Sequence, residues 1–215
     1  TGCSFLIEKN NELRPKDLGV NIPVFSIKQV WSTKIGAINE VPLSIHVNDA
    51  ALTIASADGV IAAVDARTGK DVWRAMLKEP LSAGVGSDGR FAAVVSSANE
   101  LIVLDSGRER WRYRLTAQVF TSPLVAGSRV FVLTADHGVI AFDASNGKIL
   151  WSQQKTGENL VLRQSGVLIT VGNTLVTGIS GRLIGLNPDN GVVRWSVPLS
   201  IPRGTNDIER LVELV

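Results

Sequence analysis

Few side chains in this sequence have the type and spacing that catalysis or metal binding requires. Asp58, Asp136 and Asp189 could hold a cation or act as a base, and His46 and His137 could bind a metal or move a proton. The three aspartates lie in segments typical of turns, where capping backbone N–H groups is their ordinary role, and the two histidines are isolated. No Ser-His-Asp set, phosphate loop or metal cluster stands out. The sequence therefore predicts a protein that is not an enzyme, with no catalytic, cofactor-binding or metal-binding residue.

The one cysteine, Cys3, is a candidate site of lipidation. The segment Thr1-Gly2-Cys3-Ser4 resembles the end of a bacterial lipoprotein signal, in which the cysteine becomes the acylated first residue. Residues 1–28 are polar, contain Pro15 and Pro23 and show no sustained period, so we expect a tether behind an anchor in the outer membrane. The alternative is an ordinary thiol. A single cysteine excludes disulfides and multi-cysteine metal sites within the chain.

Composition narrows the classes of partner. The chain has 215 residues, 45% of them hydrophobic, and a formal net charge of +2 with acidic and basic residues interspersed. That balance excludes the basic stripe of a nucleic-acid-binding protein, and the hydrophobic share indicates a folded chain. No apolar run is long enough to span a bilayer.

Five tryptophans divide the chain into similar steps. Trp31, Trp73, Trp111, Trp151 and Trp195 are 42, 38, 40 and 44 residues apart. Each tryptophan after the first lies in the last of four short β-prone runs separated by Asn, Asp and Gly turns, as in an antiparallel meander. A period near forty with four strands per unit is typical of a β-propeller. The sequence thus predicts an all-β fold with four-stranded blades at residues 42–78, 80–116, 120–155 and 166–199.

The same turn chemistry recurs ahead of the tryptophans. An outer-strand tryptophan can bridge adjacent blades, because it offers a large apolar ring and an N–H group. We expect an oxygen-bearing side chain to cap the preceding turn and a glycine to adopt a positive φ. In the second unit Ser106-Gly107-Arg108 makes a tighter turn. The recurring residues are Asp65, Asp105, Asp143 and Asn187 at the end of the third run, and Gly69, Gly147 and Gly191 four residues before a tryptophan.

The first tryptophan and the last residues do not belong to complete units. Trp31 lies in a run, residues 29–36, that resembles an outer strand without inner partners, and we expect it to close the last blade of a ring. Residues 206–215 begin another unit. We therefore expect four blades, residues 29–205 in all, from the N-terminal half of a longer propeller.

Residues 63–73 match the tryptophan-docking motif A-x-D-x-x-T-G-x-x-x-W of pyrroloquinoline-quinone-like propellers. Residues 141–151 match with Asn146 in place of Thr, and residues 185–195 match more loosely. The chain is thereby identified as a member of that superfamily, which contains enzymes and non-catalytic scaffolds.

Within the superfamily the chain resembles the BamB family of outer-membrane protein assembly factors. The resemblance rests on the lipoprotein-like start, on Leu160-Val161-Leu162-Arg163, which matches an L-x-L-R loop, and on Asp207–Leu211, which is similar to an I-[DE]-R-L segment. It implies an eight-bladed periplasmic lipoprotein that binds the insertase BamA and assists the folding of outer-membrane proteins. It further implies that Leu160, Leu162, Arg163 and Glu213 contact the periplasmic domains of BamA, although Val215 stands where the second residue of the family's acidic pair is expected.

Two alternative functions and one alternative site remain open from the residues alone. A quinoprotein dehydrogenase would need a cofactor and Ca²⁺ on the propeller axis, and an extracytoplasmic sensor would recognise a ligand through its loops. Leu160–Leu162 could also form a buried inner strand, with Arg163 as a surface charge, in place of an interface on a loop between blades.

Overall fold

The computed structural model describes residues 27–39, 44–154, 166–179 and 182–198. Every regular element in these ranges is a β-strand, and the strands form four antiparallel sheets. In each sheet four consecutive strands pair in sequence order, which confirms the predicted four-stranded blades. The described ranges contain no helix of the length and hydropathy needed to cross a membrane.

The first two blades lie within the predicted ranges 42–78 and 80–116. The first contains β1 (Ile45–Asn48), β2 (Ala51–Ala55), β3 (Val60–Asp65) and β4 (Asp71–Met76). The second contains β5 (Gly86–Ser87), β6 (Phe91–Val95), β7 (Glu100–Asp105) and β8 (Arg108–Arg114).

The third and fourth blades repeat this order within the predicted ranges 120–155 and 166–199. The third contains β9 (Leu124–Ala126), β10 (Arg129–Leu133), β11 (Val139–Asp143) and β12 (Ile149–Gln153). The fourth contains β13 (Val167–Val171), β14 (Thr174–Ile179), β15 (Arg182–Leu186) and β16 (Val193–Pro198).

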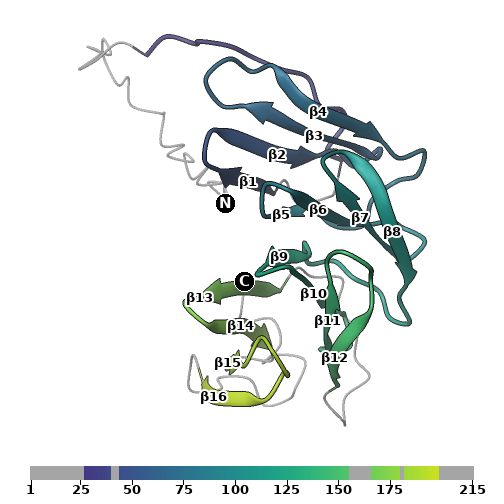
Figure 1. Cartoon of the computed structure of the whole chain (residues 1–215), viewed down its shortest axis with the longest axis vertical. Helices are drawn as coiled ribbons and strands as arrows, with labels where there is room; N and C mark the ends of the chain where they lie inside the picture. The colour runs from purple at the N-terminus through teal and green to yellow at the C-terminus, as the bar shows by residue number, and fades with distance from the viewer. Residues whose placement is uncertain (1–26, 40–43, 155–165, 180–181, 199–215) are drawn as a thin grey trace, which may run out of the picture.

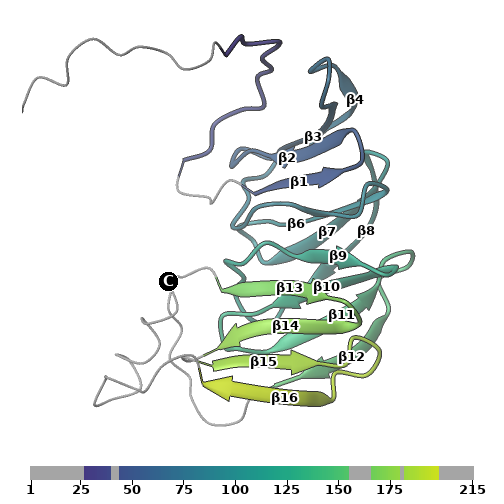
Figure 2. The same ribbon diagram turned by 90° about the vertical axis from the view of Figure 1, so that its left-hand side faces the viewer.

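The four blades follow one another around an arc. Figure 1 shows β1, β5, β9 and β13 on the concave side of the arc and the fourth strand of each blade on the outer side, and Figure 2 shows the blades stacked face to face. This is the β-propeller architecture expected from the sequence. Because the strands of each blade alternate in direction, the connections between blades, such as residues 77–85 and 115–123, lie at one end of the stack. The turns between the third and fourth strands lie at the other end.

The hydrophobic core lies between blades, because a single sheet cannot bury both of its faces. Three clusters of buried side chains fill the three interfaces between consecutive blades. In the middle one, Val103 of β7 and Phe142 of β11 are completely buried against each other's sheets. Stability therefore depends on how neighbouring blades are held together.

The segment before the first blade contains Trp31 and has no strand assignment over residues 27–39. It lies along the first blade, where the Ala57 N–H donates to the Ala37 carbonyl oxygen at 2.7 Å. A cavity of about 550 Å³ separates residues 33–38 from β1 and β2. That residues 29–36 close the last blade of a ring stays a prediction.

Candidate functional site

The docking tryptophans form a ladder in which the first four indole rings each cover a glycine of the following blade. A Cβ atom at Gly147 would lie 2.8 Å from Cδ2 of Trp111, and a Cβ at Gly191 would lie 2.6 Å from Cε3 of Trp151. Such distances leave room only for glycine. The four pairs are Trp31 with Gly69, Trp73 with Gly107, Trp111 with Gly147 and Trp151 with Gly191. The predicted positive φ is confirmed at Gly69, Gly147 and Gly191, with values of 69°, 74° and 73°.

Three indole N–H groups also bond to the turn they cover. The Nε1 atoms of Trp31, Trp111 and Trp151 donate to the carbonyl oxygens of Ala66, Ala144 and Pro188 at 2.9, 2.8 and 2.9 Å. Trp73 makes no such bond to any residue in the described ranges; the turn it covers is the short Ser106–Gly107 hairpin. These tryptophans thus bridge to the following blade as predicted. At the interface between the first and second blades, Trp73 does so by ring contact without an indole hydrogen bond to a described residue.

The predicted caps hold the turns beneath the first and third rungs. Asp65 Oδ1 accepts hydrogen bonds from the Arg67 and Thr68 N–H groups and from the Thr68 hydroxyl at 2.8–3.0 Å. Asp143 Oδ1 accepts from the Ser145 hydroxyl and N–H. Because these bonds favour the ionised form, the Thr68 hydroxyl lowers the pKa of Asp65 and the Ser145 hydroxyl lowers that of Asp143. In the fourth blade Asn187 Oδ1 accepts from the Asp189 N–H at 3.0 Å.

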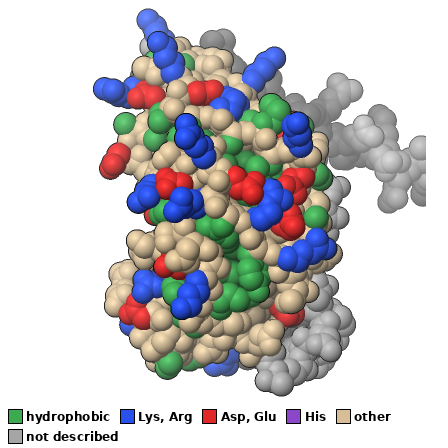
Figure 3. All heavy atoms as spheres, turned by 45° about the vertical axis from the view of Figure 1, so that its right-hand side comes forward, with side chains coloured by type: hydrophobic (Ala, Val, Ile, Leu, Met, Phe, Trp, Pro, Cys, Tyr) green, Lys and Arg blue, Asp and Glu red, His purple; other side chains and the backbone are tan. Residues whose placement is uncertain are grey.

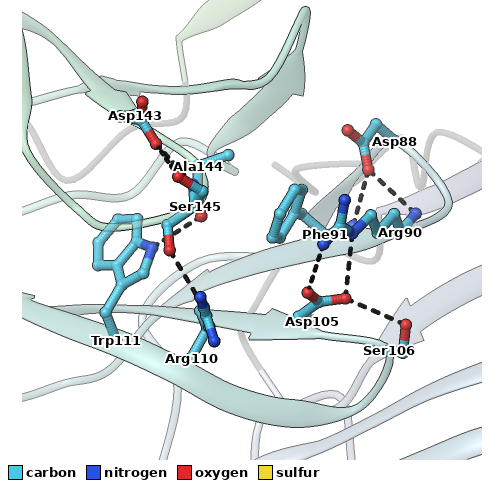
Figure 4. A network of polar contacts seen from close by, with 10 residues as sticks. All are labelled: Asp88, Arg90, Phe91, Asp105, Ser106, Arg110, Trp111, Asp143, Ala144 and Ser145. Atoms are coloured by element: carbon cyan, nitrogen blue, oxygen red, sulfur yellow. Dashed lines mark hydrogen bonds and ion pairs between the residues drawn. The ribbon is translucent and has the colours of Figure 1, made fainter.

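The second blade departs from this scheme. Asp105 forms an ion pair with Arg90, whose Nη2 lies 2.9 Å from Oδ2, and that guanidinium lowers the pKa of the Asp105 carboxyl. The hairpin after Asp105 has a positive φ at both central residues, Ser106 (51°) and Gly107 (81°), as a two-residue turn of type I′ requires. Figure 4 shows this network beside the Trp111 rung, where Arg110 Nε also donates to the Ser145 carbonyl oxygen at 3.1 Å.

The last rung, Trp195, covers its own blade. Its ring lies over Gly185, which pairs with it across β15 and β16, and a Cβ there would be 2.2 Å from Cε2. Trp195 is 39% exposed as a residue, whereas Trp151 is 9% exposed. The equivalent partners of Trp73 and Trp151 are Ala63 and Ala141, which carry a Cβ.

The predicted partner-binding residues Leu160, Leu162 and Arg163 fall in the connection between β12 and β13 and lie outside the described residues, as do Glu213 and the lipidation site Cys3. The two ends of that connection are fixed. Trp151 is docked on the fourth blade, and the Gly166 N–H donates to Thr121 Oγ1 at 2.8 Å. Gly166, where the described chain resumes, therefore lies beside residues 115–123, the preceding connection of the same kind.

The three aspartates considered as cation ligands or bases form hydrogen bonds or an ion pair with other side chains of the fold. Asp58 accepts from the Ser56 hydroxyl, Asp136 from the Thr134 hydroxyl at 2.5 Å, and Asp189 pairs with Arg129 of the third blade at 2.7 Å. His137 occupies a turn with a φ of 63°, and burial lowers the pKa of His46. Within the described ranges, no three His, Cys, Asp or Glu side chains come together as metal ligands.

Sequence reasoning missed the contacts that link blades outside the motif. Among them are the Arg129–Asp189 ion pair, the Arg110–Ser145 hydrogen bond and a 2.7 Å contact between the hydroxyls of Ser44 and Ser122. Each joins residues at least 35 positions apart in different blades, and nothing in the local pattern marks either partner.

Comparison with known proteins gives one consistent result. Residues 57–215 match a family model described as outer membrane protein assembly factor BamB. Curated relatives of that name come from Bordetella pertussis, 31% identical over 100% of this chain and 56% of the relative, and from Burkholderia pseudomallei, 35% identical over 88% and 50%. The chain thus spans about half the length of the curated relatives it matches.

Solved structures support the fold. The crystal structure of BamB from Moraxella catarrhalis is similar with a TM-score of 0.67 and 21% identity, covering 78% of this chain and 52% of that one. Quinohemoprotein alcohol dehydrogenase from Comamonas testosteroni is similar with a TM-score of 0.60 and 17% identity, covering 79% and 36%. At such identities both likenesses concern the fold alone.

Proposed function

Because this chain belongs to the family of the outer membrane protein assembly factor BamB, we propose that it acts as a non-catalytic scaffold in outer-membrane protein assembly. The observation that carries the proposal is the match of the family model to residues 57–215, which include the last two strands of the first blade and all of the next three blades. The curated relatives are named as assembly factors and not as enzymes. The likeness to quinohemoprotein dehydrogenases extends to the fold only and supports no cofactor.

We propose that the protein works on the periplasmic face of the outer membrane, anchored by lipid at Cys3. The lipoprotein-like segment Thr1–Ser4 supports this location, and the polar residues up to 28 provide the tether. Two acyl chains on a cysteine give stable anchoring where one gives only reversible binding.

The proposed partner is BamA, bound through Leu160, Leu162 and Arg163 with a contribution from Glu213. Docked Trp151 and the Gly166–Thr121 hydrogen bond support this site, because they fix both ends of the connection on a rigid pair of blades. Two leucines that become buried contribute about 1.5–3 kcal/mol each, and an arginine at the centre of an interface is often a hot spot.

Co-elution of the purified protein with the purified periplasmic domains of BamA tests the partner. We expect one complex on size-exclusion chromatography, and elution of the two as separate species at micromolar concentration would contradict the proposal. Fractionation of cells tests the anchor separately. Wild-type protein is expected in the outer membrane and Cys3→Ser protein in the soluble periplasmic fraction, whereas unchanged membrane association of the variant would exclude Cys3 as the anchor.

A further inference from the structure

The outer strand of the second blade, β8, departs from the repeat in its charge. Its sequence Arg-Glu-Arg-Trp-Arg-Tyr-Arg contains four arginines in seven residues. The outer strands β4 and β16 contain one arginine each, and β12 contains no charged residue. The blade fold therefore does not require this concentration of guanidinium groups.

The same strand carries an aromatic side chain that the repeat does not require either. Tyr113 pairs with Leu101, and the residues in the same register of the other blades are Ala75, Gln153 and Val197. Tyr113 and Trp111 pack on Phe142 of the third blade, with ring centroids 5.0 and 5.9 Å apart, and both remain partly exposed. The Tyr113 hydroxyl bonds to no residue that the structure describes.

Two of the four arginines on β8 lack a neutralising carboxylate among the described residues. Arg112 pairs with Glu79, Glu100 and Glu109 at 2.7–3.3 Å. Arg108 and Arg114, at the two ends of the strand, have no ion-pair partner among the described residues, and Arg110 bonds only to a carbonyl oxygen. Like charges at this spacing repel one another, so they cost stability unless an anionic group comes near.

The strand is also an open edge. β8 is the last strand of its sheet, so its outer backbone N–H and C=O groups face away from β7. Along a strand, successive side chains point to opposite faces, which puts Trp111 and Tyr113 on one face and Arg112 and Arg114 on the other. Figure 3 shows the side of the molecule that carries the outer strands, with apolar side chains beside a band of interspersed basic and acidic ones.

We propose that the outer edge of β8 binds an extended protein segment that alternates aliphatic and acidic side chains. The aliphatic side chains would contact Trp111 and Tyr113, and the acidic ones would lie on the opposite face, where Arg114 has no ion-pair partner among the described residues. Tryptophan, tyrosine and arginine are the residues enriched at interface hot spots, and addition of a strand to a sheet edge is a common mode of peptide recognition. This surface includes no residue of the connection at 155–165, and the proposal does not depend on the proposed function.

A fluorescence anisotropy titration with a labelled seven-residue peptide that alternates glutamate and leucine tests the proposal. We expect saturable binding to the wild-type protein that weakens as salt is raised from 50 to 500 mM. A double variant, Tyr113→Gln with Arg114→Gln, should bind at least tenfold more weakly. The matched control is Met76→Gln, because Met76 has the register of Arg114 in the first blade and is 71% exposed.

Three results would overturn the proposal. They are no binding of the glutamate peptide to the wild-type protein, equal binding to the double variant, and equal binding of a peptide that alternates lysine and leucine. If the arginines serve only to keep the sheet edge from pairing, neither peptide binds. Thermal unfolding of each variant shows whether a loss of binding reflects a loss of the fold.

Discussion

The side-chain hydroxyls of Ser44 and Ser122 lie 2.7 Å apart, although a complete blade separates the two serines in the sequence. Gly84, just before the first strand of that intervening blade, lies beside the pair, and a Cβ atom at Gly84 would be 2.6 Å from both hydroxyl oxygens. The first and third blades therefore meet on the concave side, over the innermost segment of the second. Crowding at this point explains why the segment before β6 contains glycines.

The close approach of Gly86 to the backbone of the third blade predicts that adding one methyl group at Gly86 strongly destabilises the fold. A Cβ at Gly86 would lie 1.9 Å from the carbonyl oxygen of Pro123, so Gly86→Ala must displace the backbone of one blade from the other. We expect a loss of about 1–3 kcal/mol or more in the free energy of unfolding, measured by urea denaturation. Gly178→Ala is the control, because its nearest contact is 3.5 Å away and its φ is unremarkable, and it should change stability by less than about 1 kcal/mol. Equal effects of the two substitutions would contradict the crowding.

The ladder predicts a difference between two tryptophans. Trp111→Phe removes the hydrogen bond to the Ala144 carbonyl oxygen, whereas Trp73→Phe removes no such bond within the described residues. Both lose similar ring area, so Trp111→Phe should cost about 1 kcal/mol more than Trp73→Phe in the free energy of unfolding. The contrary result would be an equal or greater cost at Trp73, which would assign the stability of the ladder to ring packing alone.

The caps predict a specific acid sensitivity. The pKa of Asp143 is lowered in the folded state from its ordinary 3.8 by bonds from Ser145. The native state therefore binds fewer protons, so this contribution is complete above pH 3.8 and is lost as pH falls through the folded pKa. Asp143→Asn keeps an acceptor oxygen, as Asn187 does in the fourth blade, but cannot titrate. Urea denaturation between pH 2 and 7 should show the wild-type advantage shrinking below about pH 4; a constant difference across the range would contradict this assignment.

Much of the fold could be predicted because its signals are local and repeated. The spacing of the tryptophans, the glycines four residues before them and the turn aspartates define each blade within about forty residues of sequence. Asp65 and Asp143 cap their turns as expected, since a cap depends on residues two or three positions away. Asp105 does not cap its turn, because its hairpin is shorter and its carboxylate forms an ion pair with Arg90, fifteen residues earlier.

The features that could not be predicted depend on contacts between blades, and a sequence repeat does not specify which residues of different blades meet. The partner of Trp73 could be predicted as a turn of the next blade, but not the absence of an N–H bond there. The Ser44–Ser122 contact follows from the curvature of the arc, and the packing of Tyr113 on Phe142 joins two neighbouring blades. The residues proposed for partner binding were reached only through resemblance to a family.

The most direct test of the central claim is the affinity of the protein for the periplasmic domains of BamA, measured by calorimetric titration. A double variant, Leu162→Ala with Arg163→Glu, should bind at least tenfold more weakly, a loss of about 1.4 kcal/mol or more, while it unfolds at the wild-type urea concentration. Arg67→Glu is the matched charge reversal, on a side chain that is 82% exposed in the first blade, and should leave the affinity unchanged. Wild-type affinity in the double variant would contradict the claim that the connection between β12 and β13 is the binding site.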